Sequence, residues 1–312
     1  MSAPIVAPPA DVAAPGPIPG RAGPRFRSNP WRKPRFLEAF TWLFLLWSLA
    51  PVVIAVLLSF NAGRSIGVWQ GFSLRWYYQD RVLSIWHDPT YRTAIFQTLR
   101  LATITTIVAV PIGAAFAIGI DRWRGPAPAF FNFQMLLSFV MPELIIGVAL
   151  LFVFTTLFTV VRLGTVAQTL GLITFQVSYP VIICRARLLS IGNVYEEAAM
   201  DLGASPVQAI RRVLLPLLYP AIFASVVLVF ADCIDDFVIV RYLSSTASTE
   251  PMSVQIYDSA RSSPTPALNA LATVMLVSSI IAVTIGYLLY RRWTRGERAM
   301  ATSAVGEFAA QI

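Results

Sequence analysis

Four acidic residues lie inside otherwise apolar stretches of the sequence: Glu143, Asp232, Asp235 and Asp236. A carboxylate deep in an apolar run is costly unless it faces water, a partner or a cavity, so these side chains need an explanation. Asp235 and Asp236 follow Asp232 by three and four residues, a spacing that places side chains on one face of a helix. Grouped carboxylates can replace water around an ammonium ion, and the pattern therefore predicts a layer that binds a flexible dication or trication.

The two groups of acids are predicted to lie at nearly the same depth. Asp232 lies 15 residues beyond Leu217, or about 22 Å along a helix that rises about 1.5 Å per residue. Glu143 lies 13 residues beyond Phe130, or about 20 Å along a helix with the same direction. A single negative layer is therefore expected.

The surroundings of the acids leave alternatives open. Tyr179 and Phe237 offer aromatic faces for cation–π contact with a bound cation. Alternatively, the acids form structural ion pairs with Arg241 or with arginines of a partner protein. A further alternative is that the helix ends before Asp235, which would leave Asp235 and Asp236 in solvent.

A polar segment between two apolar runs, residues 193–216, reads NVYEEAAMDLGASPVQAIRRVLLP. Its composition predicts two short helices with a sharp joint. Asn193 is expected to cap the first helix, and Glu196 and Glu197 in the first turn complement the helix dipole. Gly203 occupies the position of a left-handed C-terminal cap.

The second helix of this segment has its own end signals. Ser205 is expected to cap it, with Pro206 at the first position and Gln208 completing a capping box. Pro216 is expected to close the segment where the next apolar run begins. Such an amphipathic helix–turn–helix is too polar to enter a membrane and is suited to docking in a groove of another protein.

Signals of catalysis and of metal binding are missing from the sequence. There is no GxxxxGK[ST] loop and the only lysine is Lys33, so ATP is not expected to bind this chain. His87 is the only histidine, and Cys184 and Cys233 lie alone in separate apolar runs. We therefore predict no catalytic residue, no metal site and no cofactor in this chain.

The composition defines the elements that must hold these residues. Of 312 residues, 56% are hydrophobic and 13% are charged, with mean hydropathy +0.66 and net charge +8. A soluble domain has about 25% charged residues, so a soluble enzyme, a disordered protein and a nucleic-acid-binding module are excluded. Apolar runs of roughly 20 residues predict an all-α polytopic membrane protein with about six transmembrane helices. The predicted spans are 37–60, 93–120, 130–161, 165–188, 216–240 and 267–290.

The two ends of the chain differ from the apolar part. Residues 1–36 are rich in proline and then in arginine, and we expect a disordered tail there. Residues 37–290 form the predicted transmembrane domain, and residues 291–312 form a C-terminal tail. With the amino terminus inside, the inner segments hold about 16 lysines and arginines and the outer segments about 7, which favours two cytoplasmic termini.

The polar segment also carries a family resemblance. Glu197-Ala198-Ala199, three residues, Gly203, nine residues and then Val213-Leu214-Leu215-Pro216 resembles the cytoplasmic EAA loop of binding-protein-dependent ABC importer permeases. The family usually has isoleucine at the position of Val213. The resemblance implies the type I ABC importer permease fold and a coupling helix that docks into a cleft of an ATPase subunit. The residues implied in this contact are Glu196, Glu197, Ala198, Ala199, Gly203, Val213, Leu215 and Pro216.

Further segments are similar to the spermidine/putrescine branch of the same family, in the same order along the chain. They are GFSLRWY at 71–77, Met141-Pro142-Glu143, Asp235-Asp236-Phe237-Val238-Ile239 and Asn269-Ala270-Leu271-Ala272-Thr273. The resemblance implies a permease subunit of a bacterial inner membrane that imports a polyamine. The implied partners are a second homologous permease, two ATPase subunits that bind ATP and magnesium, a periplasmic substrate-binding protein and membrane lipid, but no nucleic acid.

Two other functions stay open at this point. One is an ABC permease for another solute, such as an aminophosphonate, iron or an opine, because the EAA loop does not specify the solute. The other is a secondary transporter or channel that uses Glu143 and Asp236 as ion sites. A secondary transporter or channel would give residues 193–216 no function.

Overall fold

The computed structural model describes residues 35–65, 68–123, 125, 127–262 and 265–310. The predicted tail therefore lies, through residue 34, outside the described residues. The chain divides into two units, Met1–Ala50 and Pro51–Ile312, with the boundary inside helix α1 (Arg35–Ser59). Every contact described below lies within the second unit.

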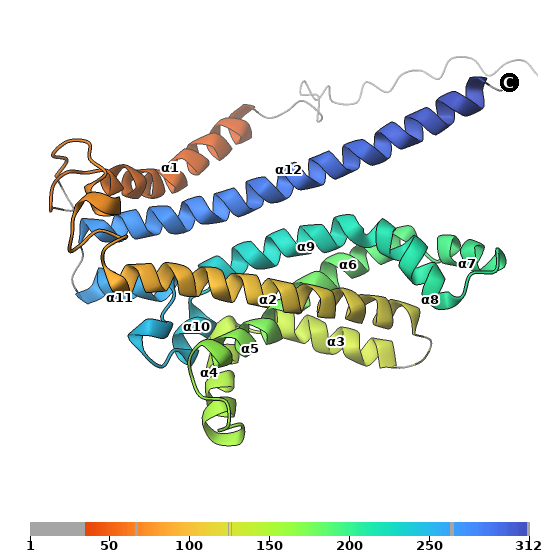
Figure 1. Cartoon of the computed structure of the whole chain (residues 1–312), viewed down its shortest axis with the longest axis horizontal. Coiled ribbons are helices and arrows are strands. Elements are labelled where there is room, and N and C mark those ends of the chain that lie inside the picture. The colour runs from red at the N-terminus through yellow and green to blue at the C-terminus, as the bar shows by residue number, and fades with distance from the viewer. Residues whose placement is uncertain (1–34, 66–67, 124, 126, 263–264, 311–312) are drawn as a thin grey trace, which may run out of the picture. The chain divides into compact units, whose positions relative to one another are not determined.

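The second unit is built from helices joined by short connections (Figure 1). After α1 they are α2 (Pro89–Arg122), α3 (Ala127–Val140), α4 (Glu143–Phe152), α5 (Thr165–Gln176), α6 (Ser178–Ile191), α7 (Val194–Asp201), α8 (Pro206–Ala209), α9 (Leu215–Asp235), α10 (Val238–Leu243), α11 (Met252–Ser262) and α12 (Pro266–Ala310). Short turns of π or 3₁₀ geometry are η1 (Arg75–Gln79), η2 (Val153–Leu157), η3 (Ile210–Leu214) and η4 (Ala247–Thr249). The prediction of an all-α protein is confirmed.

The number of membrane spans is five or six among the described residues. Five segments are long and apolar enough to cross a membrane: Arg35–Ser59, Pro89–Arg122, Thr165–Ile191, Pro206–Asp235 and Pro266–Arg292. The sixth predicted span corresponds to a pair of helices, Pro128–Val140 and Glu143–Leu157, which are bent by 103° at a short break. The prediction of about six spans holds if the bent pair is one crossing.

The prediction of one continuous helix over 130–161 is wrong. Pro142 has extended backbone (ψ 127°), and the helical path stops at Val140 and restarts at Glu143. Proline lacks an N–H and disfavours helical backbone at the residue before it, here Met141. The break places Glu143 in the first turn of α4 rather than in the middle of a span.

The predicted span 216–240 is also displaced. Its helix begins at Pro206 and ends at Asp235, and Asp236 leaves it with ψ 126°. Pro216 does not close the preceding segment as predicted, because the π turn η3 comes directly before it, with the Leu215 N–H donating to the Ile210 carbonyl. A π turn is wider than an α turn, which accommodates a proline without ending the helix.

Helices α2, α6 and α9 pack against one another and form the centre of the unit. Helices α2 and α6 approach each other closely at Gly113, where a Cβ would lie 2.5 Å from Cγ of Pro180. Only a residue without a side chain fits there. On α6, Pro180 directly follows Tyr179, and on α2, Gly113 comes before Arg122, the last residue of the helix. Tyr179 and Arg122 belong to the two regions that are described below.

Candidate functional site

Three of the four predicted acids meet where helices break. Glu143 begins α4, Asp232 lies in the last turn of α9, and Asp236 follows the end of α9. The carboxyl groups of Glu143 and Asp236 are within interaction range of each other. The phenol of Tyr179 on α6 lies within electrostatic reach of all three acids. We call Glu143, Asp232 and Asp236, with Tyr179, the acid cluster.

Asp236 is the most enclosed member of the acid cluster, with 6% of its surface exposed. Its Oδ1 accepts a hydrogen bond from the Val240 N–H at 3.2 Å, and its main-chain carbonyl accepts one from Ser253 Oγ at 2.6 Å. Its Oδ2 is buried without a hydrogen-bond partner among the described residues. Asp232 accepts a hydrogen bond from Gln176 Nε2 at 2.7 Å. The cluster therefore keeps an acceptor that no hydrogen-bond donor among the described residues fills.

Asp235 differs from Asp236 in its surroundings. Because α9 ends at Asp235, Asp236 turns away from the helix, and the prediction of one helical face shared by all three residues is wrong for Asp236, while Asp232 and Asp235 stay on α9 within electrostatic reach of each other. Asp235 lies exposed on the surface of the chain, whereas Asp236 is buried. The alternative that placed both residues in solvent is therefore also wrong.

Aromatic rings surround the acid cluster as the sequence predicts. Tyr179 makes edge-on contacts with Phe139, at 5.6 Å between ring centroids, and with Phe175, at 6.0 Å. Phe237, directly after Asp236, packs on Tyr257 at 4.8 Å. A pocket of about 280 Å³ opens beside the α3–α4 break, with Phe175 in its wall. The wall of this pocket offers the aromatic face of Phe175 but contains none of the three acids.

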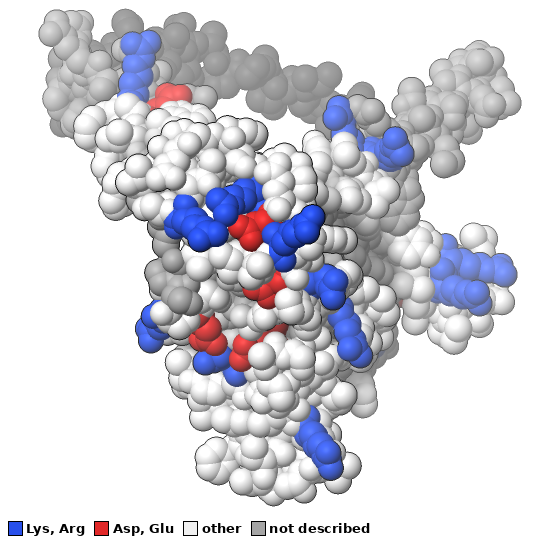
Figure 2. Space-filling model, turned by 60° about the vertical axis from the view of Figure 1, so that its left-hand side comes forward, with Lys and Arg blue, Asp and Glu red and all other residues white. Residues whose placement is uncertain are grey.

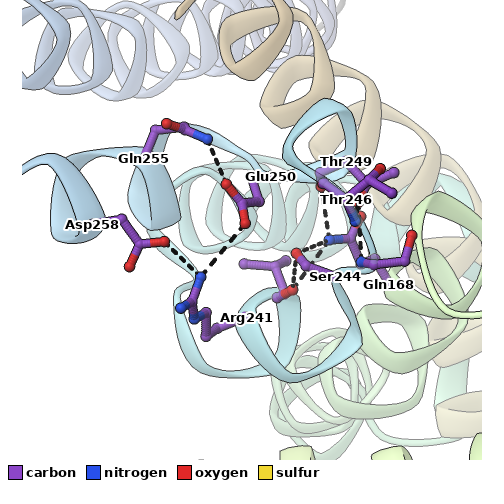
Figure 3. Close-up of polar contacts among 10 residues, drawn as sticks. Gln168, Arg241, Ser244, Thr246, Thr249, Glu250, Gln255 and Asp258 are labelled. Atoms are coloured by element: carbon purple, nitrogen blue, oxygen red, sulfur yellow. Dashed lines mark hydrogen bonds and ion pairs between the residues drawn. The ribbon is translucent and has the colours of Figure 1, made fainter. Parts of the chain in front are cut away.

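Arg241 does not neutralise the acid cluster. Its guanidinium pairs with Asp258 at 2.7 Å and with Glu250 at 3.6 Å, and Gln255 donates to Glu250 at 2.5 Å (Figure 3). The ion pairs between described residues include none with Glu143, Asp232 or Asp236. The alternative of structural pairing with Arg241 is wrong.

The end of the molecule with α10 and α11 shows arginines and carboxylates together on its surface (Figure 2). Besides Arg241, Arg75 pairs there with Asp80 at 2.9 Å. The N–H groups of Leu83 and Val82 donate to Asp80 at 3.1 Å each. These hydrogen bonds, together with the Arg75 charge, hold the pKa of Asp80 below its ordinary value.

Gln168 on α5 was not identified from the sequence. Its fully buried Nε2 donates to the carbonyls of Val240 and Thr249 and to Ser244 Oγ, at 3.1, 2.9 and 2.8 Å (Figure 3). Its Oε1 accepts from Gln97 Nε2 at 2.9 Å. These bonds hold α10, and hence the chain just after Asp236. The sequence feature that could have identified Gln168 is a side-chain amide inside an apolar run.

The joint of the 193–216 segment is as predicted. Gly203 has φ +87°, its N–H donates to the Met200 carbonyl at 2.9 Å, and the Ala204 N–H donates to the Ala199 carbonyl at 3.1 Å. This pair of bonds defines a Schellman cap, which favours glycine because of the positive φ. A sharp turn therefore separates α7 from α8.

The two predicted N-terminal caps have different outcomes. The Ser205 capping box is confirmed, with Ser205 N–H donating to Gln208 Oε1 at 2.9 Å and Gln208 N–H donating to Ser205 Oγ at 3.4 Å. Asn193 precedes α7 but its side chain makes no capping bond. Its backbone is near-helical (φ −101°, ψ −11°) rather than extended, so the side chain does not reach the first turn.

The predicted docking residues differ in exposure. Glu197, Ala198 and Gly203 are exposed, while Ala199, Val213, Leu215 and Pro216 are partly buried. Glu196 is buried and forms an ion pair with Arg122 at 2.5 Å. Apolar side chains are nevertheless exposed along the segment, including Leu202 at 91% and Val207 at 73%. This surface is suited to contact with another protein.

Comparison with known families identifies the family to which the fold belongs. The chain belongs to the family described as "Binding-protein-dependent transport system inner membrane component", which matches residues 109–298. It is thus a multi-pass inner-membrane protein of a transport system, as its spans also indicate.

Individual relatives and a solved structure are similar to the chain. It is 32% identical over 270 residues to the "Putrescine transport system permease protein PotI" of Escherichia coli (strain K12), covering 84% of this chain and 92% of that protein. It is 29% identical to the "Spermidine/putrescine transport system permease protein PotC" of Haemophilus influenzae, covering 82% and 96%. A chain of a bacterial ABC transporter for the acidic polysaccharide alginate superimposes with TM-score 0.68 at 16% identity, covering 83% and 96%. The last likeness confirms the predicted ABC importer permease fold.

Proposed function

We propose that this chain is a transmembrane permease subunit of an ATP-driven ABC importer, and that it forms part of the path for a polyamine such as putrescine or spermidine. The observation that carries the proposal is the acid cluster, in which the buried Asp236 carboxyl lies within interaction range of the partly buried Glu143. A cation bound between these carboxylates would offset their mutual repulsion and the cost of burying charge. The printed functions of the two permease relatives support a polyamine as that cation.

The 193–216 segment is proposed to receive the force of ATP hydrolysis. Glu197 and the apolar side chains of Leu202 and Val207 are exposed there, beside Arg211 and Arg212. A mixed apolar and charged helical surface of this kind docks into a groove of a partner. The proposed partner is an ATPase subunit, and ATP and magnesium would be bound by that subunit.

The assembly and its orientation follow from the same proposal. A second, homologous permease completes the path, two ATPase subunits contact the two permeases, and a periplasmic binding protein delivers the solute. Both termini and the 193–216 segment are placed in the cytoplasm, because lysines and arginines are more frequent in the segments on that side. Transport then alternates between two states that expose the acid cluster to either side.

The test is transport by the reconstituted assembly. The chain is purified with its partner subunits, placed in proteoliposomes, and supplied with binding protein, ATP and radiolabelled putrescine. We expect uptake that requires ATP, stops with vanadate and persists with an uncoupler. Uptake that stops with an uncoupler and ignores vanadate contradicts the proposal in favour of a secondary transporter. Uptake of neither putrescine nor spermidine, with active uptake of another solute, contradicts the polyamine assignment alone.

A further inference from the structure

Arg122, the last residue of α2, holds three elements together. Its Nη2 lies 2.5 Å from a carboxylate oxygen of Glu196 on α7 and donates to the Gly192 carbonyl at 3.1 Å, at the end of α6. Its Nη1 pairs with the carboxylate of the neighbouring Asp121. A guanidinium presents several donors in one plane, which allows it to bind several acceptors at once. We call Arg122, Asp121, Glu196 and Gly192 the arginine clamp.

The clamp is shielded from solvent. The side chain of Arg122 is 20% exposed, and those of Asp121 and Glu196 are each 10% exposed. Loss of one partner from a shielded ion pair leaves the other charge uncompensated, which is far more costly than loss of a surface pair. The clamp therefore resists opening unless one of its members is changed.

The clamp joins α7 to the ends of α2 and α6, whereas the other packing of α7 is against η3 and α8 of its own segment. Glu196 is the only residue of α7 that is buried, so the helix has no apolar core of its own against the spans. Its two ends are turns rather than helical continuations, at Gly192 (φ +69°) and at Gly203 (φ +87°). By contrast, α8 continues through η3 into α9 as one unbroken helical segment, Pro206–Asp235. The two halves of the 193–216 segment are thus joined to the bundle by different means.

We propose that the arginine clamp is the element that makes α7 move together with α2 and α6, so that Arg122 is a positioning residue for coupling ATP hydrolysis to transport. The inference rests on the proposed docking of an ATPase subunit to residues 193–216. When that subunit displaces α7, the ion pair passes the displacement to the ends of two spans. Without the clamp, α7 pivots on its two glycine turns while the spans stay in place.

The test uses the full transporter with Arg122→Gln, and Glu196→Gln as a milder variant in case the first does not insert. We expect the ATPase to stay attached and to hydrolyse ATP at a similar rate, while putrescine imported per ATP falls about tenfold or more. Amide hydrogen exchange across α7 is expected to accelerate about tenfold. Arg122→Lys, which keeps the charge, is expected to restore part of the import ratio.

Two control variants separate this proposal from the docking proposal. Arg92→Gln removes an exposed arginine from the other end of α2 and is expected to change neither ratio nor exchange. Glu197→Gln changes the exposed neighbour of Glu196 and is expected to weaken ATPase attachment without accelerating exchange. The clamp proposal is overturned if import and hydrolysis fall in proportion in Arg122→Gln and Glu196→Gln, or if exchange of α7 is unchanged. Loss of attachment in Glu196→Gln equal to that in Glu197→Gln also overturns it, because Glu196 would then act in docking.

Discussion

Shielded carboxylates occur in two regions of this molecule, and the regions differ in where the compensating cation comes from. In the arginine clamp, Arg122 lies between the carboxylates of Asp121 and Glu196. In the acid cluster, Glu143 and Asp236 face each other, and no ion pair of the described residues reaches them. Helix α6 connects the two regions, because it holds Tyr179 of the acid cluster and ends at Gly192, whose carbonyl accepts from Arg122 in the clamp.

The difference follows from what each region must do. A carboxylate with a permanent arginine is a mechanical joint, since the pair stays closed while its elements move. Carboxylates without a cation from the chain stay poised for a cation from outside, and the absence of a permanent partner allows that cation to leave again. The local backbone differs accordingly: the clamp joins helix ends, whereas the cluster lies at the α3–α4 break and just beyond α9.

The largest expected effect is on the acid cluster. Asp236→Asn keeps an oxygen for the Val240 N–H but removes the charge, so a bound ammonium loses a buried ionic contact. Loss of such a contact costs about 3 kcal/mol, and we expect putrescine uptake to fall about 100-fold with normal membrane insertion. Radiolabelled uptake in proteoliposomes measures the change. Asp235→Asn, at the exposed neighbour, is the matched control. Equal losses of uptake in the two variants would contradict a specific role of the buried Asp236, because the exposed Asp235 would then matter as much.

The second effect concerns the contact between the two regions. At Gly113 a Cβ meets the rigid Pro180 ring at 2.5 Å, so Gly113→Ala must move α2 away from α6. We expect a loss of about 1 to 3 kcal/mol in stability, as for other overpacked sites. Gly119→Ala on the same helix has no atom within 4 Å and gains about 1 kcal/mol of helix propensity. Thermal unfolding in detergent compares them, and similar midpoints would show that this contact is not tight.

The sequence predicted the ends of helices better than the course of the spans. The Schellman turn at Gly203 and the capping box at Ser205 are local, and each depends on residues a few positions apart. The predicted cap at Asn193 is wrong, because the backbone angles of Asn193 prevent its side chain from capping α7. These angles cannot be read from the sequence. Glu143 and Asp232 both lie within electrostatic reach of Tyr179 although Pro142 breaks the helix between Phe130 and Glu143, and their common depth in the membrane stays a prediction.

Long-range contacts account for what the sequence could not predict. Hydropathy alone treats 130–161 and 216–240 as plain spans, because a run of apolar residues has the same pattern whether it is straight or bent. The clamp required knowing that Arg122 and Glu196, 74 positions apart in the sequence, become neighbours. Gln168 was detectable as an amide in an apolar run, but its partners near Val240 and Thr249 were not.

A third variant would turn the acid cluster into a second clamp. Gln176 donates to Asp232 at 2.7 Å, so Gln176→Lys places a permanent ammonium beside that carboxylate. We expect an increase of about 1 kcal/mol in stability, or about 2 to 4 °C in the unfolding midpoint, together with reduced uptake. Gln176→Met, similar in length and without charge, is the control and should not be stabilised. Undiminished uptake by the Gln176→Lys variant would contradict the idea that the acid cluster must lack a permanent cation.

The smallest effect tests Asp80, a carboxylate paired with Arg75, whose side chain is 32% exposed and thus more open to solvent than that of Arg122 at 20%. The pKa of Asp80 is held below its ordinary value by the N–H groups of Leu83 and Val82 and by Arg75, so the ionised form favours the folded loop. This contribution is present at neutral pH and is lost as the pH falls through the lowered pKa, below about 4.

Hydrogen exchange at the Val82 and Leu83 amides, corrected for intrinsic rates, measures this contribution. Protection is expected to fall only about threefold between pH 6 and pH 3, since the Arg75 side chain is 32% exposed and solvent screens its charge. Asp80→Asn should show the low-pH protection throughout and no pH dependence. A fall of the same size in Asp80→Asn would assign the effect to another group. A much larger fall in the unmodified chain would mean that the pair resists opening as the arginine clamp does, although its arginine is more exposed than Arg122.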